Sequence, residues 1–299
     1  IRSMANRGAL GFATPEAQEI FSGAYVVAPQ STSFWLEDGD RFAPLIREII
    51  RDLVRRRTVG REPVAYLVGL GHVRIARVSG LDDLSHVQIR DRAFLAAAEE
   101  SGLIVPMGRW ALREACRQMR AWREAHPAAA DLAVNVNLST RQFLHAALVD
   151  EVEEALRESG LPGNALRLEI TESAIMERGE ACVELLCSLK ALGVQLCIDD
   201  FGTGYSSLSY LHRFPVDVLK IDRSFMRDLG VHGENMGIVR AIVALAHGLG
   251  MHAVPEGLET PEHLACVREL ECAFGQGYLF SAPVDPGRAG ELLRTGRHW

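Results

Sequence analysis

The feature that most constrains the fold is the alternation of short apolar runs with amphipathic helical patterns along this 299-residue chain. Apolar runs of about four to eight residues predict buried strands, and apolar residues spaced i, i+3, i+4 predict helices. Strands that alternate with helices favour a parallel sheet. The strand-like runs lie at 64–68, 73–78, 132–138, 166–171, 194–198, 216–221, 252–255 and 274–280, and the helical patterns at 42–57, 91–100, 110–124, 147–159, 181–192, 206–211, 237–249 and 261–270.

The number of strand-like runs indicates the α/β class and a (β/α)8 TIM-type barrel. A chain of this length holds either one large barrel or two ordinary domains. About eight strands without a glycine-rich dinucleotide fingerprint favour the closed barrel over a doubly wound sheet. Residues 1–40 lack clear periodicity, so we expect an N-terminal extension there and a barrel domain over 41–299.

Composition excludes several classes of function. With 48% hydrophobic and 24% charged residues the chain is globular, and its net charge of -7 argues against binding a nucleic acid polymer. We find no apolar run long enough for a membrane span and no signal peptide. The six cysteines form no C-x-x-C motif and no zinc-like pairing with histidine, so we expect buried, reduced thiols and a cytoplasmic location.

Two adjacent carboxylates, Asp199 and Asp200, follow the apolar run 194–198 and precede Phe201-Gly202-Thr203. Neighbouring carboxylates at the end of a buried strand repel each other and lose solvation, and a divalent cation is the usual compensation. The alternative is a solvated turn before a glycine loop. The rest of the chain favours the cation.

Polar residues stand where each of several consecutive strands ends. Because successive strand ends of a barrel converge on one rim, we expect these side chains to meet in one pocket. A single buried glutamate or lysine would be explained by a structural ion pair, but so many oxygen donors in the same relative position fit a metal site better. The residues are Asn137, Glu169, Glu172, Asp199, Asp200, Lys220, Asp222, Glu256 and Gln276.

The donor types narrow the choice of metal. Oxygen donors without histidine or cysteine suit magnesium or manganese, and also calcium. The ten histidines form no ligand pair at helical or strand spacing, which argues against zinc. Two ions sharing Asp199 could clamp a phosphate and activate a water, with Lys220 supplying fixed positive charge and Glu256 as candidate general base.

These stretches make the chain similar to the EAL domain family, bacterial phosphodiesterases for cyclic di-GMP. The similarity covers about two-thirds of the chain in family order. It is carried by Glu99-Glu100-Ser101-Gly102-Leu103-Ile104, Leu112-Arg113-Glu114-Ala115-Cys116, Val136-Asn137-Leu138-Ser139, Leu168-Glu169-Ile170-Thr171-Glu172-Ser173, the Asp199-Asp200 segment, Leu219-Lys220-Ile221-Asp222, Glu256-Gly257-Leu258-Glu259 and Gln276-Gly277-Tyr278-Leu279-Phe280.

The resemblance implies a modified barrel with an antiparallel first strand, cyclic di-GMP as ligand, and Mg²⁺ or Mn²⁺ as cofactor, two ions if the domain is active. It further implies a homodimer through the loop after Asp200 and a protein effector as a possible partner. The implied roles are metal binding by Asn137, Glu169, Asp199 and Asp200; catalysis by Glu256 and Lys220, with Glu172 holding the loop; and ligand binding by Arg77, Asp222 and Gln276.

The N-terminal quarter departs from the family pattern. The first strand is expected near 63–70, where Leu67 replaces a ligand-contacting glutamine, and the signature Glu-Ala-Leu is expected near 73–77, which reads Val-Arg-Ile-Ala-Arg. No acidic residue occurs between Glu62 and Asp82, and using Glu62 itself would require a long insertion. Arg77 can stand in for the phosphate-contacting arginine. Loss of one carboxylate should weaken metal binding and hydrolysis more than nucleotide binding.

Three hypotheses follow from different classes of function. The favoured one is a domain that binds cyclic di-GMP with weak or lost hydrolysis. The first alternative is an active metal-dependent phosphodiesterase that opens cyclic di-GMP to linear pGpG, and the second is a protein-interaction module independent of nucleotide. Retention of the Asp199-Asp200 segment argues against the last, because unused buried carboxylates destabilise a fold.

Overall fold

The computed structural model describes residues 98–99, 102, 104–126, 130, 132–203, 211–227, 234–282, 284 and 286–295. Several expected features lie outside these residues: the extension 1–40, the helix 42–57, the strands 64–68 and 73–78, the antiparallel orientation of the first strand, and Arg77. The expected helix 206–211 is described only at its last residue, Leu211. Within the described part of the chain, no helix is long and apolar enough to cross a membrane.

The described strands form one parallel sheet, as the alternation predicted. It has five strands in the order β1 to β5, each hydrogen-bonded to the next along the chain. Such sequential order is what consecutive strand–helix units of a barrel produce. The strands are β1 (Val134–Leu138), β2 (Leu166–Thr171), β3 (Gln195–Phe201), β4 (Val218–Ile221) and β5 (His252–Pro255).

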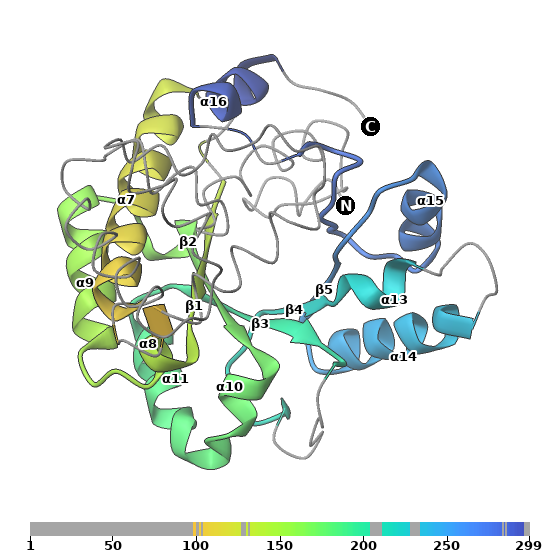
Figure 1. The fold of residues 1–299 in the computed structure, drawn as a ribbon, viewed down its shortest axis with the longest axis horizontal. Coiled ribbons are helices and arrows are strands. Elements are labelled where there is room, and N and C mark those ends of the chain that lie inside the picture. The colour runs from red at the N-terminus through yellow and green to blue at the C-terminus, as the bar shows by residue number, and fades with distance from the viewer. Residues whose placement is uncertain are drawn as a thin grey trace, which may run out of the picture. The chain divides into compact units, whose positions relative to one another are not determined.

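Helices connect the strands and lie around one side of the sheet (Figure 1). The predicted helix 181–192 is divided into a 3-10 turn and an α-helix. The sequence did not predict α8, η4, α10 and α13, which are too short to show helical periodicity, and it also did not predict the ten-residue helix α16. The elements are α7 (Ile104–Ala125), α8 (Thr140–Phe143), α9 (Leu148–Ser159), η4 (Gly163–Ala165), α10 (Glu172–Met176), η5 (Gly179–Cys182), α11 (Val183–Ala191), α13 (Arg223–Arg227), α14 (Glu234–Gly248), α15 (Pro261–Glu269) and α16 (Pro286–Thr295).

Local sequence sets where several of these helices begin. Ser139 caps α8 in a reciprocal capping box with Gln142, and Thr171 caps α10 through its hydroxyl. Thr260 caps α15, whose first residue is a proline. Each cap satisfies a backbone N–H that would otherwise lack a partner. The caps of α8 and α10 follow β1 and β2 at once, so the strand ends that carry the polar residues are held in place.

The two faces of the sheet differ in chemistry although both are buried. Side chains alternate between the faces of a strand. In β2, Leu168 and Ile170 face one way and pack into the apolar core, whereas Arg167 and Glu169 face the other way and are also only 2% exposed. We call the latter the inner face, defined by Asn137, Glu169, Asp199 and Lys220. A polar inner face in a buried sheet indicates a built site rather than a packing surface.

The expected strand 274–280 is wrong: this segment is irregular. It still lies beside the end of β5, because Gln276 N donates to Pro255 O at 2.9 Å and Leu258 N donates to Gln276 O at 2.9 Å. Gly277 lies so close to Leu258 that a Cβ added to it would stand 2.1 Å from the Leu258 carbonyl oxygen. Because Gly277 has no side chain, the backbone can make this close approach, which a regular strand does not require.

The cysteines follow the expected pattern in part. All are free, as predicted for reduced thiols, but only four of the six are buried. Cys187 is exposed on α11 and Cys266 is partly exposed on α15. Burial raises the pKa of both Cys116 and Cys272 to about 12, so these thiols stay protonated at neutral pH.

Replacing Gly277 with alanine should destabilise the protein strongly, because the new methyl group would overlap the backbone of Leu258. We expect a loss of about 2 kcal/mol or more in the free energy of unfolding, measured by urea denaturation. Gly237→Ala is the matched control. Nothing lies within 4 Å of its Cβ position on α14, so alanine there should stabilise by about 0.5–1 kcal/mol. Equal effects of the two substitutions would contradict the close approach.

Candidate metal centre at the strand ends

The centre of the site is the ammonium group of Lys220 on β4. Lys220 Nζ lies 3.0 Å from Glu169 Oε2 of β2 and 3.0 Å from Asp199 Oδ1 of β3, and it also contacts Glu256 Oε1 directly after β5. The Lys220 and Glu169 side chains are 4% and 2% exposed. Parallel strands bring four residues together that are separated by up to 87 positions (169 to 256) in the chain.

One ammonium is too little charge for the carboxylates around it. Three carboxylates surround Lys220, so the ionised cluster has an excess of negative charge. Burial raises the pKa of Glu169, and burial raises the pKa of Glu256 to about 7, despite the opposing effect of Lys220. The carboxylates keep the pKa of Lys220 well above its usual value, so the lysine stays charged. Protons on the carboxylates neutralise the excess negative charge of the cluster, and a divalent cation could take the place of these protons.

Asn137 of β1 faces two of these carboxylates. With its amide nitrogen inward, it donates to Glu169 Oε2 at 3.1 Å and to Asp199 Oδ2 at 3.3 Å. With its amide oxygen inward, it adds an oxygen donor to the same point. Its register opposite Glu169 across β1 and β2 fixes this position. Asn137 can therefore either hydrogen-bond the carboxylates or share a cation with them.

The two adjacent aspartates reach the same site because β3 is irregular between them. In a regular strand neighbouring side chains point to opposite faces. Here the pairing of β3 with β4 shifts register between Ile198 and Phe201, and Asp200 has a left-handed φ of 56°. Carboxylate oxygens of Asp199, Asp200 and Glu256 consequently lie within 4.8 Å of one another. A strained residue that aims a side chain into a site is typical of functional positions.

Asp200 is further linked to Asp222, the residue after β4. Burial, then the charges of Asp199 and Asp222, raise the pKa of Asp200 to about 6, and a hydrogen bond to Asp222 acts in the same direction. Asp222 also accepts a hydrogen bond from Ser224 N at 2.8 Å through Oδ1. Two acidic side chains held this close extend the excess of negative charge to the outer part of the site.

Glu172, the first residue of α10, supports the loop after the aspartates. Its Oε2 accepts a hydrogen bond from Gly202 N at 2.9 Å, and its side chain is buried. Gly202 has a φ of 96°, and a Cβ added there would stand 2.8 Å from the Phe225 ring. Thr203 Oγ1 donates to Asp200 O at 2.8 Å in the same turn. Glu172 thus holds the loop that follows the two aspartates.

Gln276 lies on the segment that follows β5 at the end of the sheet. Its backbone is fixed to Pro255 and Leu258, as described above, whereas its side-chain Oε1 is buried without a hydrogen-bond partner among the described residues. A buried acceptor of this kind is suited to a donor on a ligand or to water. Arg77, the remaining ligand-binding prediction, lies outside the described residues.

Sequence reasoning missed other polar residues of the inner face. Asn135 lies two positions before Asn137, and Arg167 and Cys197 lie two positions before Glu169 and Asp199. The two-residue period of a strand places such pairs on one face, so this signal was present in the sequence. Asn135 Nδ2 donates to Glu169 Oε1 at 2.5 Å, whereas Arg167 donates to Gln195 Oε1 at 3.0 and 2.6 Å.

The arrangement fits Mg²⁺ or Mn²⁺. Asn137, Glu169, Asp199 and Asp200 offer oxygen donors, as these hard cations prefer. Burial raises the pKa of Glu169, Asp200 and Glu256, so these carboxylates favour a bound proton or cation over the free charged form. Among the described residues, Asp199, Asp200 and Glu256 are also the group whose ligand atoms converge most closely.

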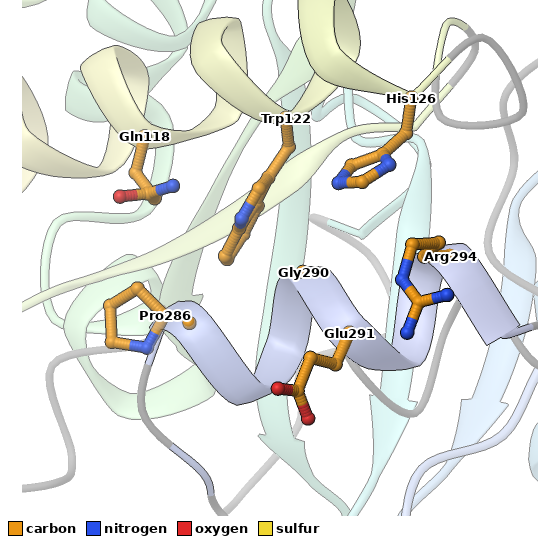
Figure 2. Close-up of a pocket in the computed structure, with 8 residues that line it drawn as sticks. Gln118, Trp122, His126, Pro286, Gly290, Glu291 and Arg294 are labelled. Carbon is orange, nitrogen blue, oxygen red and sulfur yellow. The ribbon is translucent and has the colours of Figure 1, made fainter.

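A separate pocket of about 430 Å³ lies between α7 and α16 (Figure 2). Trp122 of α7 points toward Gly290 of α16, where a Cβ would stand 3.4 Å from the indole nitrogen Nε1. None of the residues that line this pocket belongs to the predicted site. The carboxylate cluster, and not this pocket, therefore carries the chemistry inferred from the sequence.

Comparison with known proteins connects this geometry to a family. A family model described as the EAL domain matches residues 80–283, which contain every predicted site residue except Arg77. The chain is 46% identical over 205 residues to "Cyclic di-GMP phosphodiesterase NbdA" of Pseudomonas aeruginosa, covering 68% of this chain and 26% of that protein. The chain spans about a quarter of the length of the first curated relatives it matches.

Solved structures that are similar to this chain include proteins of the same family. The "PaMucR Phosphodiesterase, c-di-GMP complex" is similar with a TM-score of 0.63 and 46% identity, covering 65% of this chain and 78% of that one. The EAL enzyme Bd1971 in its "cAMP and cyclic-di-GMP bound form" has a TM-score of 0.63 and 34% identity, covering 67% of this chain and 55% of that one. Both similarities are high enough to compare the fold and the order of the strand ends.

Replacing Asp200 tests the backbone and the charge separately. Asp200→Asn and Asp200→Ala both remove the carboxylate, so both should weaken Mn²⁺ binding, measured by calorimetric titration, by tenfold or more, an order-of-magnitude estimate. Asparagine tolerates the left-handed φ of 56° better than alanine does. The alanine variant should therefore be about 1 kcal/mol less stable to urea than the asparagine variant. Wild-type affinity in Asp200→Asn would show that the carboxylate is not a ligand.

Binding of Mn²⁺ should strengthen as the pH rises from 5.5 to 7.5. The raised pKa values of Asp200, about 6, and Glu256, about 7, mean that the folded, metal-free protein holds protons there in acid, which the cation must displace. The measurement is the Mn²⁺-induced rise in the thermal unfolding midpoint, which should be larger at pH 7.5.

The induced rise, and not the midpoint itself, is the appropriate quantity for this test. Burial lowers the pKa of His252, so its contribution to stability is lost as the pH falls, opposite in sign to that of the two carboxyl groups. That contribution is present with and without metal and cancels in the difference. An equal Mn²⁺-induced rise at both pH values would contradict proton displacement.

Proposed function

Because the chain belongs to the EAL domain family of cyclic di-GMP phosphodiesterases, we propose that it binds cyclic di-GMP at the ends of β1–β5 with weak or lost hydrolysis. The observation that carries the proposal is the cluster of Glu169, Asp199 and Glu256 around Lys220. The relatives named above as cyclic di-GMP phosphodiesterase and as a c-di-GMP complex supply the ligand class.

Phosphate binding at this cluster requires added positive charge. The ligand carries two phosphodiester groups, and an uncompensated carboxylate cluster would repel them. Asn137, Glu169, Asp199 and Asp200 would hold Mg²⁺ or Mn²⁺, which supplies positive charge for the phosphate and lowers the pKa of a bound water. Lys220 adds a fixed charge that the surrounding carboxylates keep protonated. Gln276 and Asp222 would contact the nucleotide.

Glu256 is suited to accept a proton. Its pKa of about 7 means that it can take a proton at neutral pH and release it again. Hydrolysis would add water across one P–O bond, leaving a terminal phosphate and a free hydroxyl on a linear dinucleotide. Glu256 would accept the proton of that water, and Lys220 would stabilise the negative charge on the phosphate. Glu172 contributes by holding Gly202, and hence the backbone next to Asp200.

The reason to expect weak turnover is a missing carboxylate. The stretch from 63 to 81 contains no aspartate or glutamate, although the family signature glutamate belongs there. Removing one ligand from a metal site lowers metal affinity and activity, whereas nucleotide contacts are spread over several strand ends. Binding should therefore survive better than hydrolysis.

A second candidate function is full phosphodiesterase activity. The observation that favours it is 46% identity both to a protein named cyclic di-GMP phosphodiesterase and to the PaMucR phosphodiesterase. In that case another group supplies the missing ligand. A homodimer through the loop after Asp200, and binding of a protein effector, are further proposals from the resemblance. Light scattering with ligand and Mn²⁺ present should give the mass of a dimer.

Cyclic di-GMP should bind the purified chain in the presence of Mn²⁺, and Asp199→Asn should weaken that binding by tenfold or more, an order-of-magnitude estimate for losing a metal ligand. Calorimetric titration measures binding, and chromatography of the nucleotide after incubation measures product. Asp150→Asn on the exposed surface of α9 is the control and should behave as the wild type.

The two measurements together decide between the hypotheses. Binding with little linear dinucleotide supports the receptor proposal, and rapid conversion that Asp199→Asn abolishes supports the active enzyme. A chain that binds no cyclic di-GMP with or without Mn²⁺ would contradict both and leave the interaction module.

A further inference from the structure

We propose that Asn135 of β1 is a positioning residue that sets the orientation of the Glu169 carboxylate for cation binding; this inference rests on the proposed function. Asn135 is 2% exposed and lies on the inner face, two positions before Asn137. Its contact with Glu169 is the reason to assign it this role.

The contact is short and direct. Asn135 Nδ2 donates to Glu169 Oε1 at 2.5 Å, and both residues are buried. The strand register places Asn135 opposite Arg167 and Asn137 opposite Glu169, so the Asn135 amide reaches diagonally across to the carboxylate. A hydrogen bond between a buried amide and a buried carboxylate is stronger and more directional than the same contact in water.

Because of this contact, the two oxygens of Glu169 have different partners. Oε1 is taken by Asn135. Oε2 lies 3.0 Å from Lys220 Nζ and 3.1 Å from the inward-facing nitrogen of Asn137, at the centre of the cluster. Without Asn135 the carboxylate could rotate and turn either oxygen, or neither, toward the cation. Asn135 therefore fixes which oxygen of Glu169 is presented to the site.

Packing alone does not account for asparagine at this position. Asn135 Oδ1 is buried and has no hydrogen-bond partner among the described residues, which is unfavourable for stability. An apolar side chain of similar size would remove the unpaired oxygen but would leave Glu169 Oε1 without its donor. The amide orientation is nevertheless determined, because the Glu169 carboxylate can only accept and so must face the amide nitrogen. A buried asparagine whose amide is oriented by the carboxylate that it binds fits a positioning role.

The test compares Mn²⁺ affinity in Asn135→Leu and Asn135→Ala with that of the wild-type chain, by calorimetric titration of the purified protein. We expect the dissociation constant to rise about tenfold or more in both variants, the range seen when a partner of a metal ligand is removed. The thermal midpoint of each metal-free variant is measured as well, so that a loss of Mn²⁺ affinity can be separated from a loss of folded protein.

Gln195→Leu is the matched control. Gln195 lies on the same face of the next strand but one and hydrogen-bonds Arg167, not Glu169. It should keep the wild-type affinity for Mn²⁺ even if it is less stable. The proposal is overturned if both Asn135 variants bind Mn²⁺ as the wild type does, or if Gln195→Leu weakens binding as much as they do.

Crystal structures of metal-free wild-type protein and Asn135→Ala provide a readout that does not depend on metal. The proposal expects the Glu169 carboxylate to rotate or to become disordered in the variant, and an unchanged carboxylate overturns it. If the wild type binds no Mn²⁺, the proposed function loses its metal site, and the crystal structures still decide whether Asn135 orients Glu169.

Discussion

The contact on which the site depends is the ammonium of Lys220 held among carboxylates from neighbouring strands. A buried ammonium or carboxylate alone would be costly, so each group requires the others. The cluster is only possible because parallel strands end at one edge and point their alternate side chains to one face. Its excess negative charge suits it to binding a divalent cation.

Backbone irregularity serves the same site. The shifted register of β3 and the left-handed Asp200 bring two successive carboxylates to one side, which a regular strand would separate. The strain at Asp200 is maintained by its surroundings: Glu172 binds Gly202, and Thr203 binds the Asp200 carbonyl oxygen. These hydrogen bonds hold the strained backbone and thereby position the Asp200 carboxylate, so the loop and the cluster form one functional unit.

Much of the fold and of the candidate site could be predicted from the sequence, and each wrong or missing prediction has a physical cause. The bounds of β2 and β5 are confirmed, because apolar residues alternate with polar ones along β2 and follow one another in β5, and both patterns are typical of short strands. The segment 274–280 contains apolar residues as well but is irregular, since Gly277 allows a close approach to Leu258 that periodicity does not reveal. The site residues were predicted from the ends of the strands. Asn135 lies two positions before the end residue Asn137, so this criterion does not include it.

The sequence by itself determined the class of fold, the family, and the chemical types gathered at the strand ends, because alternation and residue type are local properties. Only the tertiary structure decided which of these groups touch. Lys220 and Glu256 meet Glu169 and Asp199, whereas Glu172 turns to the loop and Asn135 reaches Glu169. The physical reason is that strand register and a local bulge set these distances, and both depend on pairing between segments far apart in the chain.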